Sequence, residues 1–490
     1  MKPIESLKKM KIINKLLLAS LLLANGQLLA ADKPNFIVIL TDDQGYADVG
    51  FNGSKDIRTP HIDRIANEGT KFNNGYVSYA VCGPSRAGLL TGRYQGRFGF
   101  DRNPHMDPTD ITSGMPLDEK MISEVLKPVG YTSSIIGKWH MGSHPELVPN
   151  KRGFDHFYGF LAGGHRYFPE DLIYKDISEG LNQKNPKKIW TSWYYTKLLE
   201  NDKRIETTEY LTDELSNAAV EFIKREKDNP FFLYLSYNAP HTPLQASKEY
   251  LDRNLHIPKG KRRTYAAMIT AVDDGVGRVL ATLDELGIDD NTLVFFLSDN
   301  GGPESKNASD NGELRGHKGD YFEGGIHVPF AMRWPGKVPA GQVYNNSVSS
   351  LDILATFAGL TNAPIAKERP LDGVNLMPYV TGENKEQPHE ILFWRNFDKG
   401  IVAARRGDNK TILFKKNQQK HLYNLDKDLS ETSNLYKTKT ETFNKQQAEM
   451  ASWESELADK PAFKGLIMAK KAHAKKLKEY KNQNKKQIES

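Results

Sequence analysis

Chemically versatile side chains follow four apolar segments of this 490-residue chain. They are Asp42–Asp43 after NFIVIL, Lys138 and His140 after TSSIIG, His241 after PFFLYLSY, and Asp299–Asn300 after NTLVFFLS. Taken singly, each group is also one that a helix cap or a turn would use. In an open parallel sheet, however, the carboxyl ends of the strands border the ligand crevice. Four such groups together therefore predict one functional site.

The candidate residues divide into oxygen ligands and cations. Carboxylate and amide oxygens suit Ca²⁺ or Mg²⁺ better than zinc. The oxygen ligands are Asp42, Asp43, Asp299 and Asn300, and the cationic set is Arg86, Lys138, His140, His241 and Lys318. A divalent cation beside these cations would neutralise the charge on a sulfuryl or phosphoryl group during its transfer.

Cys82 is the only cysteine of the chain and the candidate nucleophile. One cysteine forms neither an internal disulfide nor a thiolate zinc site, and a lone buried cysteine is often an inert core residue. The surrounding VCGPSRAGLLTGRY places Pro84 near a predicted helix start and Arg86 one turn after Cys82. A helix N-terminus and an arginine would both suit an anion or a reactive thiolate there.

The run Cys82-Gly83-Pro84-Ser85-Arg86, continued by AGLLTGRY, resembles the C-x-P-S-R-x-x-x-L-T-G signature of formylglycine-dependent (type I, arylsulfatase-like) sulfatases. Further similar blocks follow in family order over residues 34–440: TDDQGYADVG, TPHIDRIANEGTKFNNGY, GKWHMG, APHTPL, LSDNGG and LRGHKGDYFEGGIHVPF. The resemblance implies that a formylglycine-generating or sulfatase-maturating enzyme converts Cys82 to formylglycine (3-oxoalanine). The lone cysteine would then be the precursor of an aldehyde.

The resemblance also implies a role for each candidate residue. Formylglycine 82 would bind one Ca²⁺ together with Asp42, Asp43, Asp299 and Asn300. Arg86 would stabilise the aldehyde hydrate, and Lys138 and Lys318 would hold sulfate oxygens. One hydroxyl of the hydrate would attack sulfur, with His241 as the acid for the leaving oxygen. His140 would deprotonate the second hydroxyl, so that the aldehyde re-forms and sulfate leaves.

The elements that position these residues are predicted to alternate between strand and helix. The four apolar segments are almost continuously apolar, as expected for strands covered on both faces in a parallel sheet. Helical patterns lie between them, for example in residues 212–227 and 263–287. The prediction is an α/β sandwich with a mainly parallel central sheet, and the family resemblance makes it alkaline-phosphatase-like.

The first 31 residues have the pattern of a secretory signal peptide. Lysines precede the apolar run from Leu16 to Leu23, and small residues follow at Ala30 and Ala31, where we expect cleavage. Export to the periplasm or the medium follows. Cleavage removes five lysines and one glutamate, which lowers the formal charge from +6 to +2. Such a charge argues against bulk nucleic-acid binding, and no later segment reaches transmembrane length.

The remaining chain is predicted to divide into three parts. Residues 32–385 would form the catalytic α/β domain. Residues 386–460 contain short alternating segments such as ILFWRN and KTILFKK, which predict a small antiparallel α+β subdomain. Residues 461–490 are rich in lysine and predict a basic, solvated helical tail.

The segment from Gly153 to Tyr195 is predicted to lie near the pocket mouth. It contains GGHRYF, which is similar to the branch of the family that acts on algal galactans, carrageenans in particular. His165 and Arg166 are the predicted contacts to the sugar, and Trp394 and Arg395 would close one side. The aromatic residues Trp190, Trp193, Tyr194 and Tyr195 would either stack on sugar rings or pack in the core.

Two other functions remain open at this stage. A phosphonate or phosphate ester hydrolase of the same superfamily would use the same aldehyde. A protein that is never matured would only hold a sulfated glycan at a Ca²⁺ site. Lysine and histidine around the anion favour sulfate, and retention of the whole Cys-x-Pro-Ser-Arg motif favours the enzyme. The sequence therefore predicts an exported sulfatase acting on a sulfated polysaccharide or oligosaccharide.

Overall fold

The computed structural model describes residues 33–175, 179 and 192–466. The predicted signal peptide, residues 467–490 of the predicted tail and Trp190 lie outside these ranges. Within the described ranges, none of the helices combines the length and apolarity that a bilayer-crossing segment needs.

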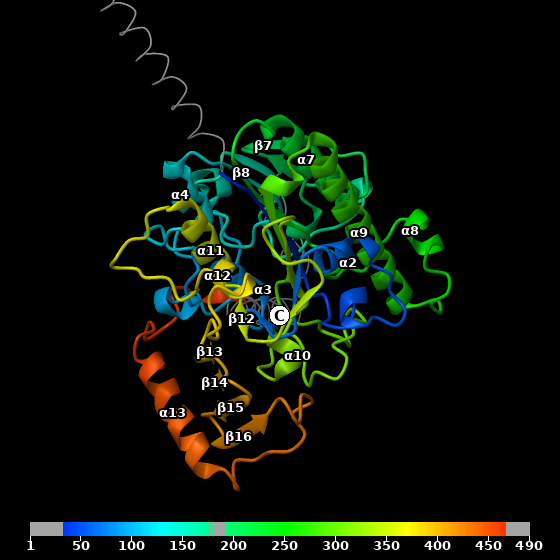
Figure 1. Cartoon of the computed structure of the whole chain (residues 1–490). Helices are drawn as coiled ribbons and strands as arrows, with labels where there is room; N and C mark the ends of the chain where they lie inside the picture. Colours follow the sequence, from blue (N-terminus) through cyan, green and yellow to red (C-terminus); the bar gives the residue numbers. More distant parts are fainter. Residues whose placement is uncertain (1–32, 176–178, 180–191, 467–490) are drawn as a thin grey trace, which may run out of the picture.

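A ten-stranded sheet in the order β11-β2-β10-β9-β1-β8-β4-β5-β6-β7 forms the centre of the molecule (Figure 1). Its strands are β1 (Asn35–Thr41), β2 (Thr70–Phe72), β4 (Thr132–Lys138), β5 (His156–Phe160), β6 (Leu198–Glu200), β7 (Lys203–Ile205), β8 (Phe231–Ser236), β9 (Thr292–Ser298), β10 (Phe330–Arg333) and β11 (Gln342–Tyr344). The strands β9, β1, β8, β4 and β5 run parallel, whereas β10, β6 and β7 pair antiparallel with their neighbours. The mainly parallel sheet was predicted; its antiparallel edges were not.

Helices cover both faces of this sheet (Figure 1). One group contains α2 (Pro60–Asn67), α7 (Leu211–Glu226), α8 (Lys248–Asp252) and α9 (Lys261–Leu286). The other contains α3 (Cys82–Thr91), α4 (Ile122–Leu126), α11 (Asp352–Thr361) and α12 (Met377–Val380). Because both faces are covered, every residue of β1, β8 and β9 is buried, which explains their apolar sequences.

The C-terminal part forms a second, four-stranded antiparallel sheet (Figure 1). Its elements are β13 (Leu392–Asn396), β14 (Ile401–Arg406), β15 (Asn409–Phe414), β16 (Gln419–Asn424) and the helix α13 (Thr440–Glu454). The helix packs on this sheet, where Phe393 stacks on Trp453 with ring centroids 5.0 Å apart. A two-stranded sheet of β3 (Gly75–Tyr76) and β12 (Val348–Ser349) completes the described strands.

The short helix α10 (Glu323–Ile326) supports the turn that follows β9. The Gly301 N–H donates to the Gly325 carbonyl oxygen at 3.1 Å. A Cβ at Gly301 would lie 1.8 Å from the Gly324 carbonyl oxygen, so the two backbones meet where only glycine fits. The position of Asp299–Asn300 therefore depends on α10.

A buried ionic cluster fixes α10 to the C-terminal sheet. The Lys410 ammonium on β15 lies 2.7 Å from a Glu323 carboxylate oxygen and 2.9 Å from one of Glu431, and all three side chains are fully buried. Burial is the largest influence on Glu323 and opposes its ionisation, but Lys410, His327 and Arg405 together outweigh it and lower the pKa. Burial raises the pKa of Glu431 to about 7. One ammonium therefore stabilises two carboxyl groups that link the subdomain to the catalytic domain.

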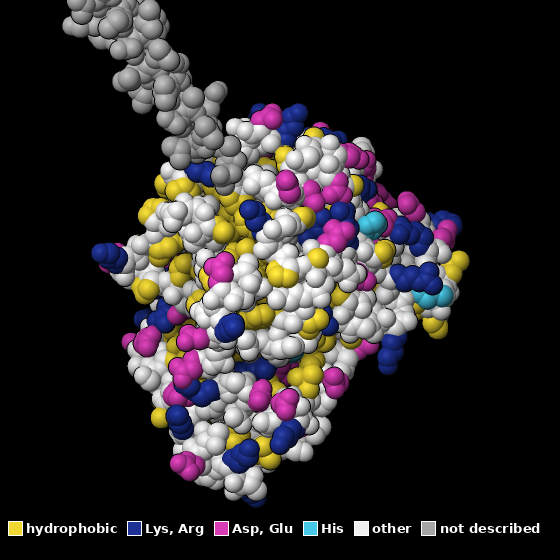
Figure 2. Space-filling model, in the orientation of Figure 1, with side chains coloured by type: hydrophobic (Ala, Val, Ile, Leu, Met, Phe, Trp, Pro, Cys, Tyr) yellow, Lys and Arg dark blue, Asp and Glu magenta, His cyan; other side chains and the backbone are white. Residues whose placement is uncertain are grey.

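Basic and acidic side chains are interspersed on the face drawn in Figure 2. The described part of this face therefore offers no extended surface of one charge.

Replacing Lys410 tests the buried ionic cluster. Lys410→Met leaves the two buried carboxyl groups without their cation, and we expect it to lower the free energy of unfolding by about 3–5 kcal/mol. Lys415→Met is the matched control, because Lys415 pairs with Glu454 at the surface and its loss should cost less than about 1 kcal/mol. Denaturant unfolding measures both, and equal effects would contradict the assigned role.

Candidate functional site

The predicted site residues meet at the carboxyl ends of the parallel strands. The register pairs Thr41 of β1 with Ser298 of β9, so Asp42–Asp43 and Asp299–Asn300 leave the sheet side by side. Lys138 ends β4, His140 follows it, and His241 follows β8. The first turn of α3 brings Cys82 and Arg86 to the same place. All four strand-end groups therefore contribute to one buried cluster.

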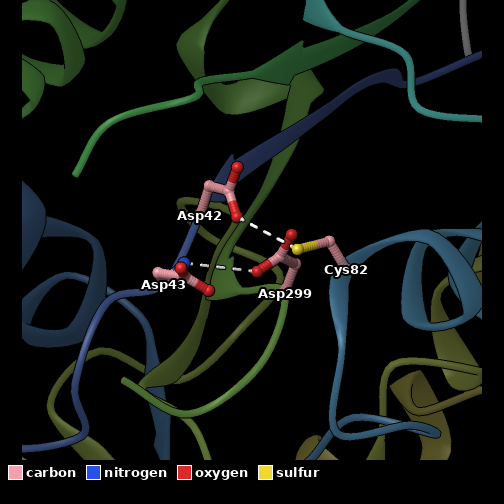
Figure 3. Close-up of side chains that lie close together, drawn as sticks. All are labelled: Asp42, Asp43, Cys82 and Asp299. Atoms are coloured by element: carbon pink, nitrogen blue, oxygen red, sulfur yellow. Dashed lines mark hydrogen bonds between the residues drawn. The ribbon is translucent and has the colours of Figure 1, made fainter. Parts of the chain in front are cut away.

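Three carboxylates and one thiol form the centre of this cluster (Figure 3). One ligand atom from each of Asp42, Asp43, Cys82 and Asp299 lies within 4.8 Å of the others. The Cys82 thiol contacts an Asp42 oxygen at 3.5 Å, and the Asp43 N–H donates to Asp299 at 3.3 Å. Burial and the nearby Asp42 charge raise the pKa of Asp299 to about 6. The three carboxylates therefore repel one another, and their close approach requires positive charge nearby.

Three cations balance these carboxylates. The Lys138 ammonium bonds Asp42, the Lys318 ammonium lies 2.6 Å from an Asp43 oxygen, and Arg86 lies 2.8 Å from an Asp299 oxygen. Burial disfavours ionised Asp43, but Lys318 and His241 outweigh it and lower the pKa to about 2. A divalent cation added to this balanced set would leave net positive charge, which suits an oxyanion.

The environment of Cys82 does not produce a thiolate. Burial and the Asp42 charge raise the pKa of the thiol to about 12, although the Lys318 ammonium lies 3.0 Å from its sulfur. The unmodified thiol is therefore neutral and a poor nucleophile at physiological pH. The reactive thiolate considered from the sequence does not fit this geometry.

Two histidines border the cluster in their neutral forms. Burial and the Lys138 charge hold the pKa of His140 well below its usual range, and its buried Nδ1 has no hydrogen-bond partner. Burial lowers the pKa of His241 to about 4 despite the opposing Asp43 charge. The His241 Nδ1 lies 2.5 Å from the Thr242 carbonyl oxygen, and its Nε2 lies 3.6 Å from Asp43.

The sequence analysis missed two polar residues at the end of β8. The Ser236 hydroxyl accepts a bond from Arg86 and donates to the Lys138 carbonyl oxygen at 2.8 Å, so it holds both residues. Asn238 is buried, and neither its amide nitrogen nor its amide oxygen has a protein partner. The sequence did contain a signal for both residues, because they lie directly at the end of an apolar strand.

Three of the four predicted substrate contacts have structural roles instead. His165 is fully buried, its ring nitrogens lie 2.8 Å from the carbonyl oxygens of Arg166 and Thr196, and its ring stacks on Phe160. The indole of Trp394, also buried, donates to the Val77 carbonyl oxygen at 2.8 Å. Arg395 is buried and lies 2.7 Å from an Asp101 oxygen. None of these three side chains presents a free polar group to a substrate.

Arg166 differs from its neighbours because it is only half-buried. Its guanidinium lies over the Tyr195 ring, 4.7 Å from the centroid, and bonds the Tyr195 hydroxyl. Tyr194 and Tyr195 are also half-buried, whereas Trp193 packs in the core. A Cβ at Gly163 would lie 2.5 Å from the His140 Nε2, so this loop adjoins the candidate site. Arg166 stays a candidate for contact with the sugar.

The oxygen ligands fit a hard divalent cation. Asn300 donates its amide N–H to Asp43 at 2.7 Å, while its amide oxygen is buried and has no hydrogen-bond partner. An unpartnered amide oxygen beside three crowded carboxylates is the donor set that Ca²⁺ prefers. The residues that would hold such an ion are Asp42, Asp43, Asp299 and Asn300 with residue 82.

Known families match most of the chain. The family described as Sulfatase matches residues 34–363, and the C-terminal family of N-sulphoglucosamine sulphohydrolase matches residues 317–458. Human N-acetylgalactosamine-6-sulfatase is 36% identical over 399 residues, which cover 78% of this chain and 72% of that protein.

Solved structures are similar over nearly the whole described chain. Ps i-CgsB, in complex with k-i-k-neocarrahexaose, is 42% identical with a TM-score of 0.81, covering 87% of this chain and 94% of that one. The PsFucS1 sulfatase from Pseudoalteromonas sp. is 26% identical with a TM-score of 0.74, covering 89% and 93%. The α/β fold is thus the alkaline-phosphatase-like fold of these enzymes. The chain belongs to the sulfatase family and is a sulfuric ester hydrolase.

Proposed function

We propose that this sulfatase is exported and removes sulfate from a carrageenan-type algal galactan, using formylglycine at position 82 and one Ca²⁺. The observation that carries the proposal is the buried cluster of Cys82, three aspartates, Arg86 and two lysines at the sheet edge. The high pKa of the thiol supports a precursor role for Cys82. The pattern of residues 1–31 supports export.

In the proposed reaction, one hydroxyl of the formylglycine hydrate forms a bond to sulfur while the bond from sulfur to the sugar oxygen breaks. The attacking hydroxyl loses a proton, and the leaving sugar oxygen gains one from protonated His241, so the number of protons is unchanged overall. His140 then takes the proton of the second hydroxyl, the bond from carbon to the sulfate oxygen breaks, and the aldehyde re-forms. The neutral His140, with its free Nδ1, suits this second step.

The cations of the site hold the reacting group in this scheme. Lys138 and Lys318 bind sulfate oxygens, and Arg86, fixed by Asp299 and Ser236, keeps the first turn of α3 in place. A bound Ca²⁺ would supply positive charge to the sulfate oxygens. Negative charge from the substrate would also raise the pKa of His241 and so favour its acid form.

We favour a sulfate ester over a phosphate ester as the substrate because the described site contains one compact cluster of metal-ligand side chains rather than two. The other grouping of acidic and histidine side chains in the described residues is His61, Asp273 and Asp274. There Asp273 accepts hydrogen bonds from the backbone N–H groups of His61 and Ile62, and so caps the start of α2. The similarity to Ps i-CgsB, solved with a neocarrahexaose, supports a carrageenan-type substrate.

The first test is sulfate release from a panel of carrageenans, ulvan, fucoidan and glycosaminoglycans by the matured protein. Release from carrageenans is expected, and Cys82→Ala should reduce it by at least about 10³-fold because the nucleophile is lost. Maturation itself should lower the mass of the Cys82 peptide by about 18 Da, since SH and H are replaced by O. Release only from another polymer would reject the carrageenan assignment, and phosphate release instead would reject the sulfate assignment.

Calcium binding is expected to stabilise the folded protein. At about 100 times the dissociation constant, Ca²⁺ should add about 2.7 kcal/mol to the free energy of unfolding, seen as a higher melting temperature. Asp43→Asn removes one charged ligand and should abolish most of this increase, whereas Asp202→Asn, at an exposed position, should keep it. A wild-type melting temperature that does not rise when Ca²⁺ is added would contradict the calcium site.

The position of His140 is tested through Gly163. The added methyl group of Gly163→Ala would lie 2.5 Å from the His140 Nε2, so the ring must move. We expect kcat for sulfate release to fall about 10²-fold, the scale of one acid–base group, with little change in melting temperature. Gly336→Ala is the control for backbone strain: its φ of +72° disfavours any side chain, but the methyl group would meet no atom within 4 Å, so melting temperature should fall while kcat stays unchanged. Unchanged kcat in Gly163→Ala would argue against His140 as the base.

A further inference from the structure

A cavity of about 440 Å³ adjoins the catalytic cluster, between the start of α3 and the C-terminal subdomain. Val81 and Gly319 line it, and they are the chain neighbours of Cys82 and Lys318. Asn103, also in the wall, accepts the Gly83 N–H at 2.8 Å. The cavity therefore shares its wall with the turn that carries the nucleophile.

Segments far apart in the sequence build this cavity. The Arg102 guanidinium donates to the Phe463 carbonyl oxygen at 2.9 Å, and the Leu466 N–H donates to the Asn103 carbonyl oxygen at 2.9 Å. On the opposite side, the Lys399 ammonium bonds the Gly319 carbonyl oxygen at 2.7 Å. These bonds fix the C-terminal segment and the β13–β14 turn against the catalytic domain, so the hollow is a defined pocket.

The cavity carries an excess of positive charge. Asp101 is neutralised by Arg395 at 2.7 Å, and Asp398 by Arg102 at 2.6 Å. Lys399 has no close ion pair among the described residues: its side chain is 52% exposed, and beside its bond to Gly319 it lies 4.0 Å from an Asp320 oxygen. Lys464 is exposed, and no ion pair to it occurs among the residues that the structure describes. Two lysines are thus available to an anion.

The rest of the lining suits a sugar ring. Val81 and Leu466 are half-buried and supply apolar surface, and the volume lies within the range of about 300–1,000 Å³ usual for small-ligand sites. A sugar that carries a sulfate group combines an apolar ring face with one negative charge. Lysine ammonium groups bind such a group as point charges.

We propose that this cavity is a subsite for a second sulfated sugar unit, next to the unit that loses its sulfate, and that Lys399 and Lys464 bind its sulfate group. The inference rests on the proposed function and deepens it. The enzyme would then select chains with sulfate groups on neighbouring units, because only these place an anion in both the catalytic cluster and the cavity.

The test compares Lys464→Met with the wild type on two substrates, because Lys399 also holds the loop of Lys318 at Gly319. With carrageenan oligosaccharides sulfated on neighbouring units, KM should rise about tenfold. With 4-nitrophenyl sulfate, which carries no second sulfate group, kcat/KM should stay within about twofold. The wild-type KM for the oligosaccharide should also rise more steeply with salt than that of the variant. Lys460→Met, at an exposed lysine outside the cavity, is the matched control.

Binding to the inactive Cys82→Ala protein keeps the test independent of turnover. Calorimetry with a multiply sulfated carrageenan hexasaccharide should show about tenfold weaker binding after Lys464→Met. Lys464→Glu should weaken binding further, because it places a negative charge beside the sulfate group, and neither change touches the Lys399 bond to Gly319. Equal binding with and without Lys464, no binding by either protein, or an equal loss on 4-nitrophenyl sulfate would overturn the inference. Absence of sulfate release by the wild type would instead reject the proposed function.

Discussion

The register between β1 and β9 is the constraint on which the site depends. Pairing of Thr41 with Ser298 makes both strands end at the same level, so Asp42–Asp43 and Asp299–Asn300 leave the sheet together. Their carboxylates repel one another in a buried place, and the structure tolerates this only because Arg86, Lys138 and Lys318 reach in from three other elements. The charge balance thus links β1, β4, β9, α3 and the Lys318 loop into one unit.

Much of this unit could be predicted from the sequence. The four apolar strands were recognisable because helices bury both of their faces, and polar residues at their carboxyl ends must converge in a parallel sheet. The resemblance to the sulfatases around Cys82 predicted the family, which the family match confirms. Local sequence also indicated the four strands of the C-terminal sheet, through their short alternating pattern.

Contacts between distant segments could not be predicted in this way. His165 was predicted to contact a sugar near the pocket mouth, yet its ring stacks on Phe160 in the core. Trp394 and Arg395 belong to a strand whose two faces are both covered: Phe393 meets Trp453 of α13, and Trp394 meets the catalytic domain at Val77. The alternating sequence of an edge strand does not reveal whether one of its faces is free or both are covered by other parts of the protein. The binding role assigned to both residues failed for this reason.

The same packing explains why selectivity has to come from outside the catalytic cluster. The cluster is buried and filled by its own charges, so it can recognise a sulfate group but little of the molecule that bears it. Recognition of the rest of the substrate then requires surfaces around the cluster, such as those where the C-terminal subdomain meets the catalytic domain. Lys410 fixes that subdomain to α10, and Lys399 fixes it to the loop of Lys318. Both the loop of Lys318 and the adjoining cavity are therefore positioned by one interface.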